Sequence, residues 1–223
     1  MARLLTTAAV VGVLGAMMPA APARAAAQAA PSPRAGMGMA YDAARGQVVL
    51  FGGYHNGSLG DTWIWDGTDW TQTTPAHSPS PRWRMGMAYD AARSQVVLFG
   101  GSGIGSLGDT WTWDGTDWTQ VNPAHSPRTR FSMGMAYDAA REQVVLFGGF
   151  GSNRNLRADT WTWDGTDWTK RSPAHKPLAR CCMGMAYDAA REQVVLFGGF
   201  GRRVILGDTW TWDGSDWTPH LAG

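Results

Sequence analysis

The chain alternates short apolar runs with turns rich in glycine and aspartate, and this pattern returns four times. In the second copy, Met85 to Tyr89 alternates, Gln95 to Phe99 is a β-branched and aromatic run, and Asp109 to Asp114 alternates threonine with tryptophan. Trp118 to Val121 forms a short last segment. Such runs predict strands, and the Gly-Gly and Asp-Gly dipeptides predict the turns that end them. We therefore expect each copy to be a four-stranded antiparallel meander.

The strongest strand of each copy is apolar on both faces. Val96 and Leu98 project to one side, and Val97 and Phe99 project to the other. A strand of this kind is sandwiched between two layers, and the neighbouring copies are the layers available. Stacking of copies around an axis predicts an all-β fold, a β-propeller of four four-stranded antiparallel blades. The copies begin at Gly38, Gly86, Gly134 and Gly184.

In each copy a hydrophobic strand ends in Gly-Gly, and a Trp-x-Trp-Asp strand and a further tryptophan follow. This repeated motif resembles that of the Kelch family. The Tyr-Asp-Ala-Ala-Arg and Leu-Gly-Asp-Thr-Trp segments are especially similar to the bacterial secreted form of the repeat. The resemblance covers residues 34–218 and implies a Kelch-type propeller spanning 34–223, with blades at about 34–74, 82–122, 130–172 and 180–219. The chain differs from many relatives, which carry a histidine at the positions of Gly36, Arg84, Ser132 and Cys182 or at the adjacent glycine.

The number of copies raises the question of ring closure. The resemblance implies six or seven blades, whereas this chain has four copies. We expect a closed or nearly closed monomer, because large apolar end faces rarely stay uncovered. The alternatives are a homodimer that covers these faces, and a truncated member of a longer propeller.

The first 33 residues do not belong to the repeat. Arg3 precedes the apolar run from Leu4 to Met18, which is too short to span a bilayer, and Ala23-Arg24-Ala25 is a small-x-small cleavage sequence. Residues 1–25 are therefore predicted to be a signal peptide and residues 26–33 a linker. We expect a secreted protein, periplasmic or extracellular after cleavage, with no membrane span.

Charge and cysteine content exclude some partners. The chain has 19 basic and 18 acidic residues and no run of like charge, so we expect no nucleic-acid partner. Cys181 and Cys182 are adjacent and predict two free or half-buried thiols, with a vicinal disulfide as the alternative.

Most of the polar residues that could carry chemistry belong to the repeat. All sixteen aspartates occupy four repeat positions, in the series that begin with Asp42, Asp61, Asp66 and Asp69, and they are predicted to cap turns. We expect the Arg45 series to pair locally and the Arg34 series to anchor loops or, alternatively, to line the axial mouth. His77, His125 and His175 recur at equal spacing, which is a weak pattern for a metal site. We therefore expect no catalytic residues, metal or cofactor.

The copies differ mainly between their second and third strands, in Tyr54–Gly60, Ser102–Gly108, Phe150–Ala158 and Phe200–Gly207. In a meander these segments and the connections between copies lie on one face, where loops commonly bind ligands. The candidate ligand-binding residues are Tyr54, Trp83, Arg84, Phe131, Phe150, Arg154, Arg157, Phe200, Arg202 and Arg203. Aromatic rings beside arginines suit a glycan, peptide or protein ligand. The alternatives are loops that vary without function, and a carbohydrate-active enzyme of the galactose-oxidase, sialidase or sugar-epimerase type, which would need blade-specific catalytic residues.

Overall fold

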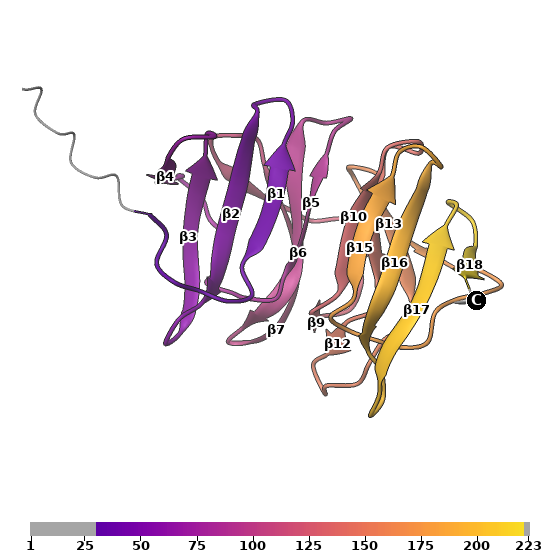
Figure 1. Cartoon of the computed structure of the whole chain (residues 1–223). Coiled ribbons are helices and arrows are strands. Elements are labelled where there is room, and N and C mark those ends of the chain that lie inside the picture. Colours follow the sequence, from indigo (N-terminus) through magenta and orange to yellow (C-terminus); the bar gives the residue numbers. More distant parts are fainter. Residues whose placement is uncertain (1–29, 221–223) are drawn as a thin grey trace, which may run out of the picture.

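The computed structural model of the protein describes residues 30–220. Every regular element in this range is a β-strand, and Figure 1 shows the strands gathered into sheets that follow one another along the chain. Within these residues no helix is long and apolar enough to cross a bilayer. The predicted signal peptide and the first half of the predicted linker lie outside the described residues.

Four of the five sheets contain four strands, and the fifth contains two. We call the four-stranded sheets blades 1 to 4, an arrangement that is compatible with a β-propeller. Blade 1 consists of β1 (Gly38–Asp42), β2 (Gln47–Tyr54), β3 (Ser58–Trp65) and β4 (Trp70–Thr73). Blade 2 consists of β5 (Gly86–Asp90), β6 (Gln95–Gly103), β7 (Gly105–Trp113) and β8 (Trp118–Val121). Blade 3 consists of β10 (Gly134–Asp138), β11 (Gln143–Phe147), β13 (Thr160–Trp163) and β14 (Trp168–Arg171). Blade 4 consists of β15 (Gly184–Asp188), β16 (Gln193–Phe200), β17 (Ile205–Trp212) and β18 (Trp217–His220).

Neighbouring strands within each blade are antiparallel and follow the order of the chain, which confirms the predicted meander. The prediction that Gly-Gly ends the second strand is wrong for blades 1, 2 and 4. In blade 1, Gly52 and Gly53 have φ values of 62° and 110° and form a bulge, after which pairing with β3 resumes. A bulge absorbs an extra residue without ending the ladder. Three of the segments predicted to be loops are therefore largely the tips of long hairpins, namely Tyr54–Gly60, Ser102–Gly108 and Phe200–Gly207.

Blade 3 keeps the irregular loop that the sequence predicted. β11 ends at Phe147, and the longer segment Phe150–Ala158 departs from the ladder. Its first two residues form β12 (Phe150–Gly151), which pairs with β9 (Arg130–Phe131) as the fifth sheet. The loop turns at Arg154, whose backbone N–H donates to the Gly151 carbonyl at 2.9 Å. The longest insertion thus produces the one blade with a separate loop structure.

The hydrophobic core is divided into three clusters, and each lies between two successive blades. Val97 and Phe99 of β6 pack against blade 3, whereas Val96 and Leu98 of the same strand pack against blade 1. The predicted sandwich is therefore confirmed. The tryptophans that begin the last strands of blades 2 to 4 are at most 1% exposed, and each removes about 150–250 Å² from water. These residues are Trp118, Trp168 and Trp217.

The four blades form an open arc, so the predicted closed ring is not found. The inner strands β1, β5, β10 and β15 contact one another in that order, and β1 has no comparable contact with β15. Figure 1 shows the indigo blade 1 and the yellow blade 4 at opposite ends of the series. Met39 and Tyr41 on the free face of blade 1 are 45% and 59% exposed, and Phe197 on the free face of blade 4 is 58% exposed. A stacking geometry that is the same at every step leaves these two faces without a neighbour.

Each blade is closed internally by a clamp between arginine and aspartate. Arg130 is fully buried, and its Nη1 and Nη2 donate to the Asp159 carboxylate oxygens at 2.7 and 2.8 Å. The same clamp joins Arg34 to Asp61, Arg82 to Asp109 and Arg180 to Asp208. The predicted anchoring role of these arginines is confirmed, and the alternative that they line the mouth is wrong. The Asp61 series (Asp61, Asp109, Asp159 and Asp208) does not cap turns, because it neutralises buried guanidinium groups instead.

The remaining aspartates have three further roles. Asp66 Oδ1 accepts hydrogen bonds from the backbone N–H groups of Thr68 and Asp69, which is the predicted turn cap. Asp42 pairs with Arg45 at 2.8 Å, as predicted for local pairing. Three members of the last series bind, at 2.7 Å, histidines of the connection that precedes their blade, a link that the turn-cap prediction missed. The pairs are His77 with Asp117, His125 with Asp167 and His175 with Asp216.

Candidate functional site

The connections between blades meet the hairpin tips on one face of the arc. Isolated bridges join Trp83 to Ser102 and Cys181 to Phe200, and β9 joins Phe131 to Phe150. These bridges place the starts of the copies beside the segments in which the copies differ. We call this surface the loop face.

An aromatic hollow of about 250 Å³ opens on the loop face at the junction of blades 2 and 3. Its lining residues are Trp83, Arg84, Ser102, Phe131, Phe150 and Arg154. The Arg84 Cζ atom lies 4.1 Å from the centroid of the Trp83 ring, a cation–π contact, and Tyr54 packs against the same indole at 5.2 Å. The rings of Phe131 and Phe150 lie 5.4 Å apart. The hollow thus has aromatic walls and two guanidinium groups.

A second hollow of about 650 Å³, which we call the arginine hollow, shares Phe150 and Arg154 with the first. Its other lining residues are Asn155, Leu156, Ala179, Phe200, Gly201, Arg202 and Arg203. Arg154, Arg202 and Arg203 are exposed, and Phe200 is half-exposed. The two hollows bring together eight of the ten candidate residues directly, and Tyr54 joins them through its contact with Trp83.

The electrostatic character of both hollows is positive. Four arginines line them, and none of their lining residues is an aspartate, glutamate or histidine. The carboxylates of the Asp61 series are engaged with buried arginines and do not neutralise this surface. Arginine presents a planar fork of donors that matches carboxylate and phosphate oxygens. The hollows can therefore hold an anionic group beside a flat or apolar surface.

Three of these arginines have left-handed backbones. The φ values of Arg84, Arg154 and Arg203 are 55°, 57° and 67°, a region that residues other than glycine seldom adopt. At Arg84 the reason is visible, because its backbone N–H donates to the Gly36 carbonyl and its carbonyl accepts from Ser132 N. These two hydrogen bonds hold the Arg84 backbone in place, and with it the position of the Arg84 Cβ atom.

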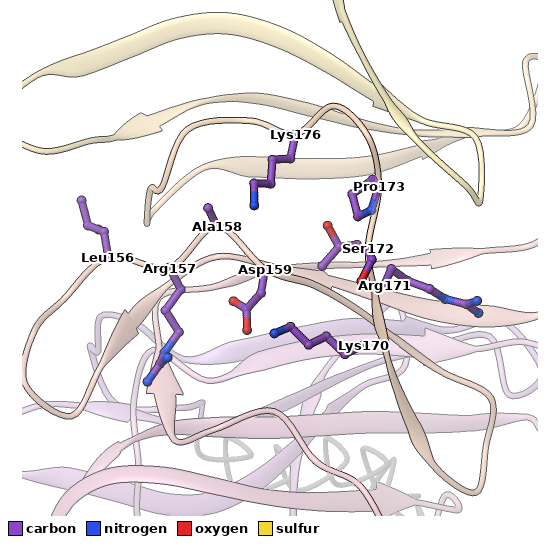
Figure 2. Close-up of a pocket in the computed structure, with 10 residues that line it drawn as sticks. Leu156, Arg157, Ala158, Asp159, Lys170, Arg171, Ser172, Pro173 and Lys176 are labelled. Carbon is purple, nitrogen blue, oxygen red and sulfur yellow. The ribbon is translucent and has the colours of Figure 1, made fainter.

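Arg157, the tenth candidate, lies in a different hollow. This lysine hollow, about 430 Å³, is lined by Leu156, Arg157, Ala158, Asp159, Thr160, Lys170, Arg171, Ser172, Pro173 and Lys176. Figure 2 shows Lys170 and Lys176 approaching it from two sides of Asp159, while Arg157 extends away from both lysines. The Arg157 Nε atom is buried without a hydrogen-bond partner, and burial followed by the charge of Arg130 lowers the pKa of Arg157. Lys170 and Lys176, the two lysines of the chain, were not among the residues predicted from the sequence.

The cysteines and histidines are separate from these hollows. The Sγ atoms of Cys181 and Cys182 lie 2.8 Å apart, and both residues are free thiols, as the sequence predicted. Burial and then the neighbouring Cys182 raise the pKa of Cys181 to about 12. The described residues contain no cluster of three or more histidine, cysteine or acidic side chains that could hold a metal ion.

Five lining residues of the two hollows were not among the candidates, namely Ser102, Asn155, Leu156, Ala179 and Gly201. They are uncharged and not aromatic, and only their position within the variable segments or beside a buried arginine distinguishes them. Comparison with known proteins adds no assignment, since neither a protein-family model nor a curated protein sequence matches the chain. The chemistry of the loop face is therefore the basis for a functional proposal.

Proposed function

We propose that this chain is a secreted, non-catalytic binding module, a Kelch-type β-propeller protein of the bacterial kind, whose loop face holds an acidic carbohydrate. The observation that carries the proposal is the pair of adjoining hollows with aromatic walls and four arginines but no carboxylate. The glycan class is favoured over a peptide or protein because the surface is hollowed at the scale of a few sugar rings.

The size and chemistry of the hollows support this ligand. The volumes of about 250 and 650 Å³ are comparable to ordinary small-ligand sites, which combine apolar walls with a few placed polar groups. The flat rings of Trp83 and Phe131 can stack against the apolar face of a sugar. Arg84 and Arg154 can then donate to a carboxylate or sulfate on that sugar or its neighbour.

The absence of any acid from the lining supports binding over hydrolysis. Glycoside hydrolysis commonly uses two carboxyl groups on opposite sides of the scissile bond. In blades 2 and 3 the Asp61 series is represented by Asp109 and Asp159, which are held by Arg82 and Arg130. Neither carboxylate lines the aromatic or the arginine hollow.

A glycan array followed by titration calorimetry tests the proposal. We expect uronic-acid or sulfated oligosaccharides to bind and their neutral counterparts to bind at least tenfold more weakly, with affinity falling as salt rises. Arg154→Ala should weaken binding about tenfold, the loss expected for one charge-assisted hydrogen bond. Trp83→Ala should weaken it comparably, because a stacking surface is lost.

The matched control is Arg128→Ala, which removes an exposed arginine that lines neither of the two hollows on the loop face. Its affinity should stay within twofold of the parent protein. Binding that survives both Arg154→Ala and Trp83→Ala unchanged would reject this face as the site.

A further inference from the structure

The two ends of the arc are complementary halves of one interface. The junction between successive blades occurs three times within the chain, and the same contacts recur each time. Blade 1 presents the half that blades 2, 3 and 4 use against their predecessors. Blade 4 presents the half that blades 1, 2 and 3 use against their successors.

The polar contacts of this junction can be followed at blades 1 and 2. Trp118 Nε1 donates to Thr62 Oγ1 at 2.9 Å, and Arg45 Nη1 donates to the Ser94 carbonyl at 3.0 Å. The Tyr89 hydroxyl accepts from the Ala44 backbone N–H at 3.1 Å. Equivalent bonds at the other two junctions are Trp168 to Thr110, Trp217 to Thr160, Arg93 to Glu142, Arg141 to Glu192, Ala92 to Tyr137 and Ala140 to Tyr187.

A backbone relay near the inner strands adds a further repeated contact. Arg84 N donates to Gly36 O, Ser132 N donates to Arg84 O, and Cys182 N donates to Ser132 O. The relay begins at Gly36 and ends at Cys182. Within residues 30–220, Gly36 N and Cys182 O take part in no further backbone bond of this relay.

The apolar contacts show the same pattern of knob and socket. A methyl group added at Gly38 would lie within 2.8 Å of Met87 Cγ, so this glycine makes the socket into which Met87 fits. Gly86 and Gly134 receive Met135 and Met185 in the same way. The fourth socket, at Gly184, has no atom within 4 Å, and the fourth knob, Met39, is 45% exposed.

Other side chains at the two ends are also more exposed, or make fewer contacts, than their counterparts at the junctions inside the arc. Phe51 packs edge-on against Trp118 at 5.3 Å and is fully buried, whereas its counterpart in blade 4, Phe197, is 58% exposed. Arg191 binds only Asp188 of its own turn, and its counterpart Arg45 also reaches the next blade. On blade 1, the counterparts of the buried Trp113 and Trp118 are the partly exposed Trp65 and Trp70.

We propose that the free face of blade 4 binds the free face of blade 1 of a second copy of this chain, and that two copies close an eight-bladed ring. The partner is a second copy of this chain, because each end of the arc presents the groups that the other end binds. Met39 and the socket at Gly184 are one such pair. Eight blades, at about 45° for each step, is at the upper end of the usual range for propellers. The two contacts are head-to-tail and are related by a twofold axis, so the ring closes without further copies.

Four blades would close alone only at about 90° for each step, with β1 and β15 in contact as neighbours around the axis. These two strands have no such contact in the arc. In the two-chain ring both loop faces open on the same side, because head-to-tail stacking preserves the direction of every blade.

Native mass spectrometry and light scattering of the purified chain test the ring. We expect a species at twice the monomer mass of 24.1 kDa, and Met39→Asp or Phe197→Asp should each raise its dissociation constant at least a hundredfold. Both positions are about half exposed in the arc, so neither change should impair folding, which circular dichroism checks. Ile104→Asp is the matched control, since Ile104 is a fully exposed apolar residue at the tip of the β6–β7 hairpin.

Mixing the two interface variants tests whether the contact is head-to-tail. The blade 4 face of the Met39→Asp chain and the blade 1 face of the Phe197→Asp chain are both intact, so the mixture should form a one-to-one dimer that neither variant forms alone. A monomeric parent protein overturns the proposal, as does a Phe197→Asp chain that dimerises as well as the parent through blade 1 alone. Open polymers in place of a dimer overturn the two-chain ring.

Discussion

The clamp in blade 3 provides a sharp test of how buried charge supports this fold. Asp159→Asn removes the negative charge but keeps the size of the side chain. Arg130, which is fully buried, then loses the carboxylate that it binds at 2.7 and 2.8 Å. One donor of the new amide also points toward the guanidinium donors, so at most one of the two hydrogen bonds is kept.

The expected loss of stability is about 3 kcal/mol, because breaking a buried ion pair leaves an uncompensated charge in the interior. The matched variant is Asp208→Asn in blade 4. The Asp208 side chain is 38% exposed and that of Asp159 is 22% exposed, so water compensates more of the change at Asp208. Arg180 is as fully buried as Arg130 and is also left with an uncompensated charge, so we expect about 2 kcal/mol for Asp208→Asn.

Urea unfolding followed by tryptophan fluorescence measures both values, and the 13 tryptophans supply the signal. With a denaturant slope of about 2 kcal/mol per molar, the midpoint should fall by about 1.5 M for Asp159→Asn and about 1 M for Asp208→Asn. Equal shifts below about 0.3 M in both variants would refute the reasoning, since the clamps would then behave as solvated surface pairs.

Three other outcomes follow from the same contacts. Asp159 has a pKa of about 2 in the folded chain, below its ordinary value of 3.8, so its stabilisation of about 2.5 kcal/mol is present above pH 4 and is lost as the pH falls through 2. Acid unfolding of the parent protein should therefore be steeper below pH 4 than that of Asp159→Asn, and parallel curves would contradict this. Because the pKa of the buried Cys181 thiol is about 12, iodoacetamide at pH 8 should modify Cys182 at least tenfold faster, and peptide mass spectrometry that finds equal labelling would show that Cys181 is accessible. Gly100→Ala should lower stability by about 2 kcal/mol, because Gly100 has a φ of 63° and an added Cβ would lie 2.6 Å from the Arg130 carbonyl oxygen. Gly46→Ser should lower the melting temperature by less than about 4 °C, because Gly46 has a similar φ of 65° but no atom within 4 Å, and Ser94 adopts a φ of 52° at the equivalent turn position.

The arrangement within each blade could be predicted because its signals are local. Alternation along Val96 to Phe99 specifies two buried faces, and each face is found against a different neighbour. The Asp66 turn cap is also local, since it spans three residues. Contacts between neighbours in sequence need only the strand period and turn chemistry.

The clamps and inter-blade links could not be predicted in the same way. Arg130 and Asp159 are separated by 29 residues, and His77 and Asp117 by 40, so no periodic pattern joins them. The Gly-Gly bulge was missed because a dipeptide that ends a strand and one that bends it have the same composition. The structure brings five of the candidate residues together around the aromatic hollow, but Arg157 lies in the lysine hollow instead, and this division depends on the path of the Phe150–Ala158 loop.

The repeat explains why the loop of blade 3 and the two ends of the arc carry the chemistry that is specific to this chain. Where the copies agree, the arginines and aspartates of the repeat form contacts within a blade or with the neighbouring blade. Chemistry that is particular to one place remains at the variable starts of the copies and where the repeat is interrupted. The longer loop of blade 3 is one interruption, and it places Arg154 and Phe150 between the two hollows of the loop face. The ends of the arc are the other interruption, and among residues 30–220 they leave Met39 and the socket at Gly184 without partners. Because the proposed ring fills the second interruption and leaves the first open, association and ligand binding use separate surfaces, and a variant at one surface should leave the other function intact.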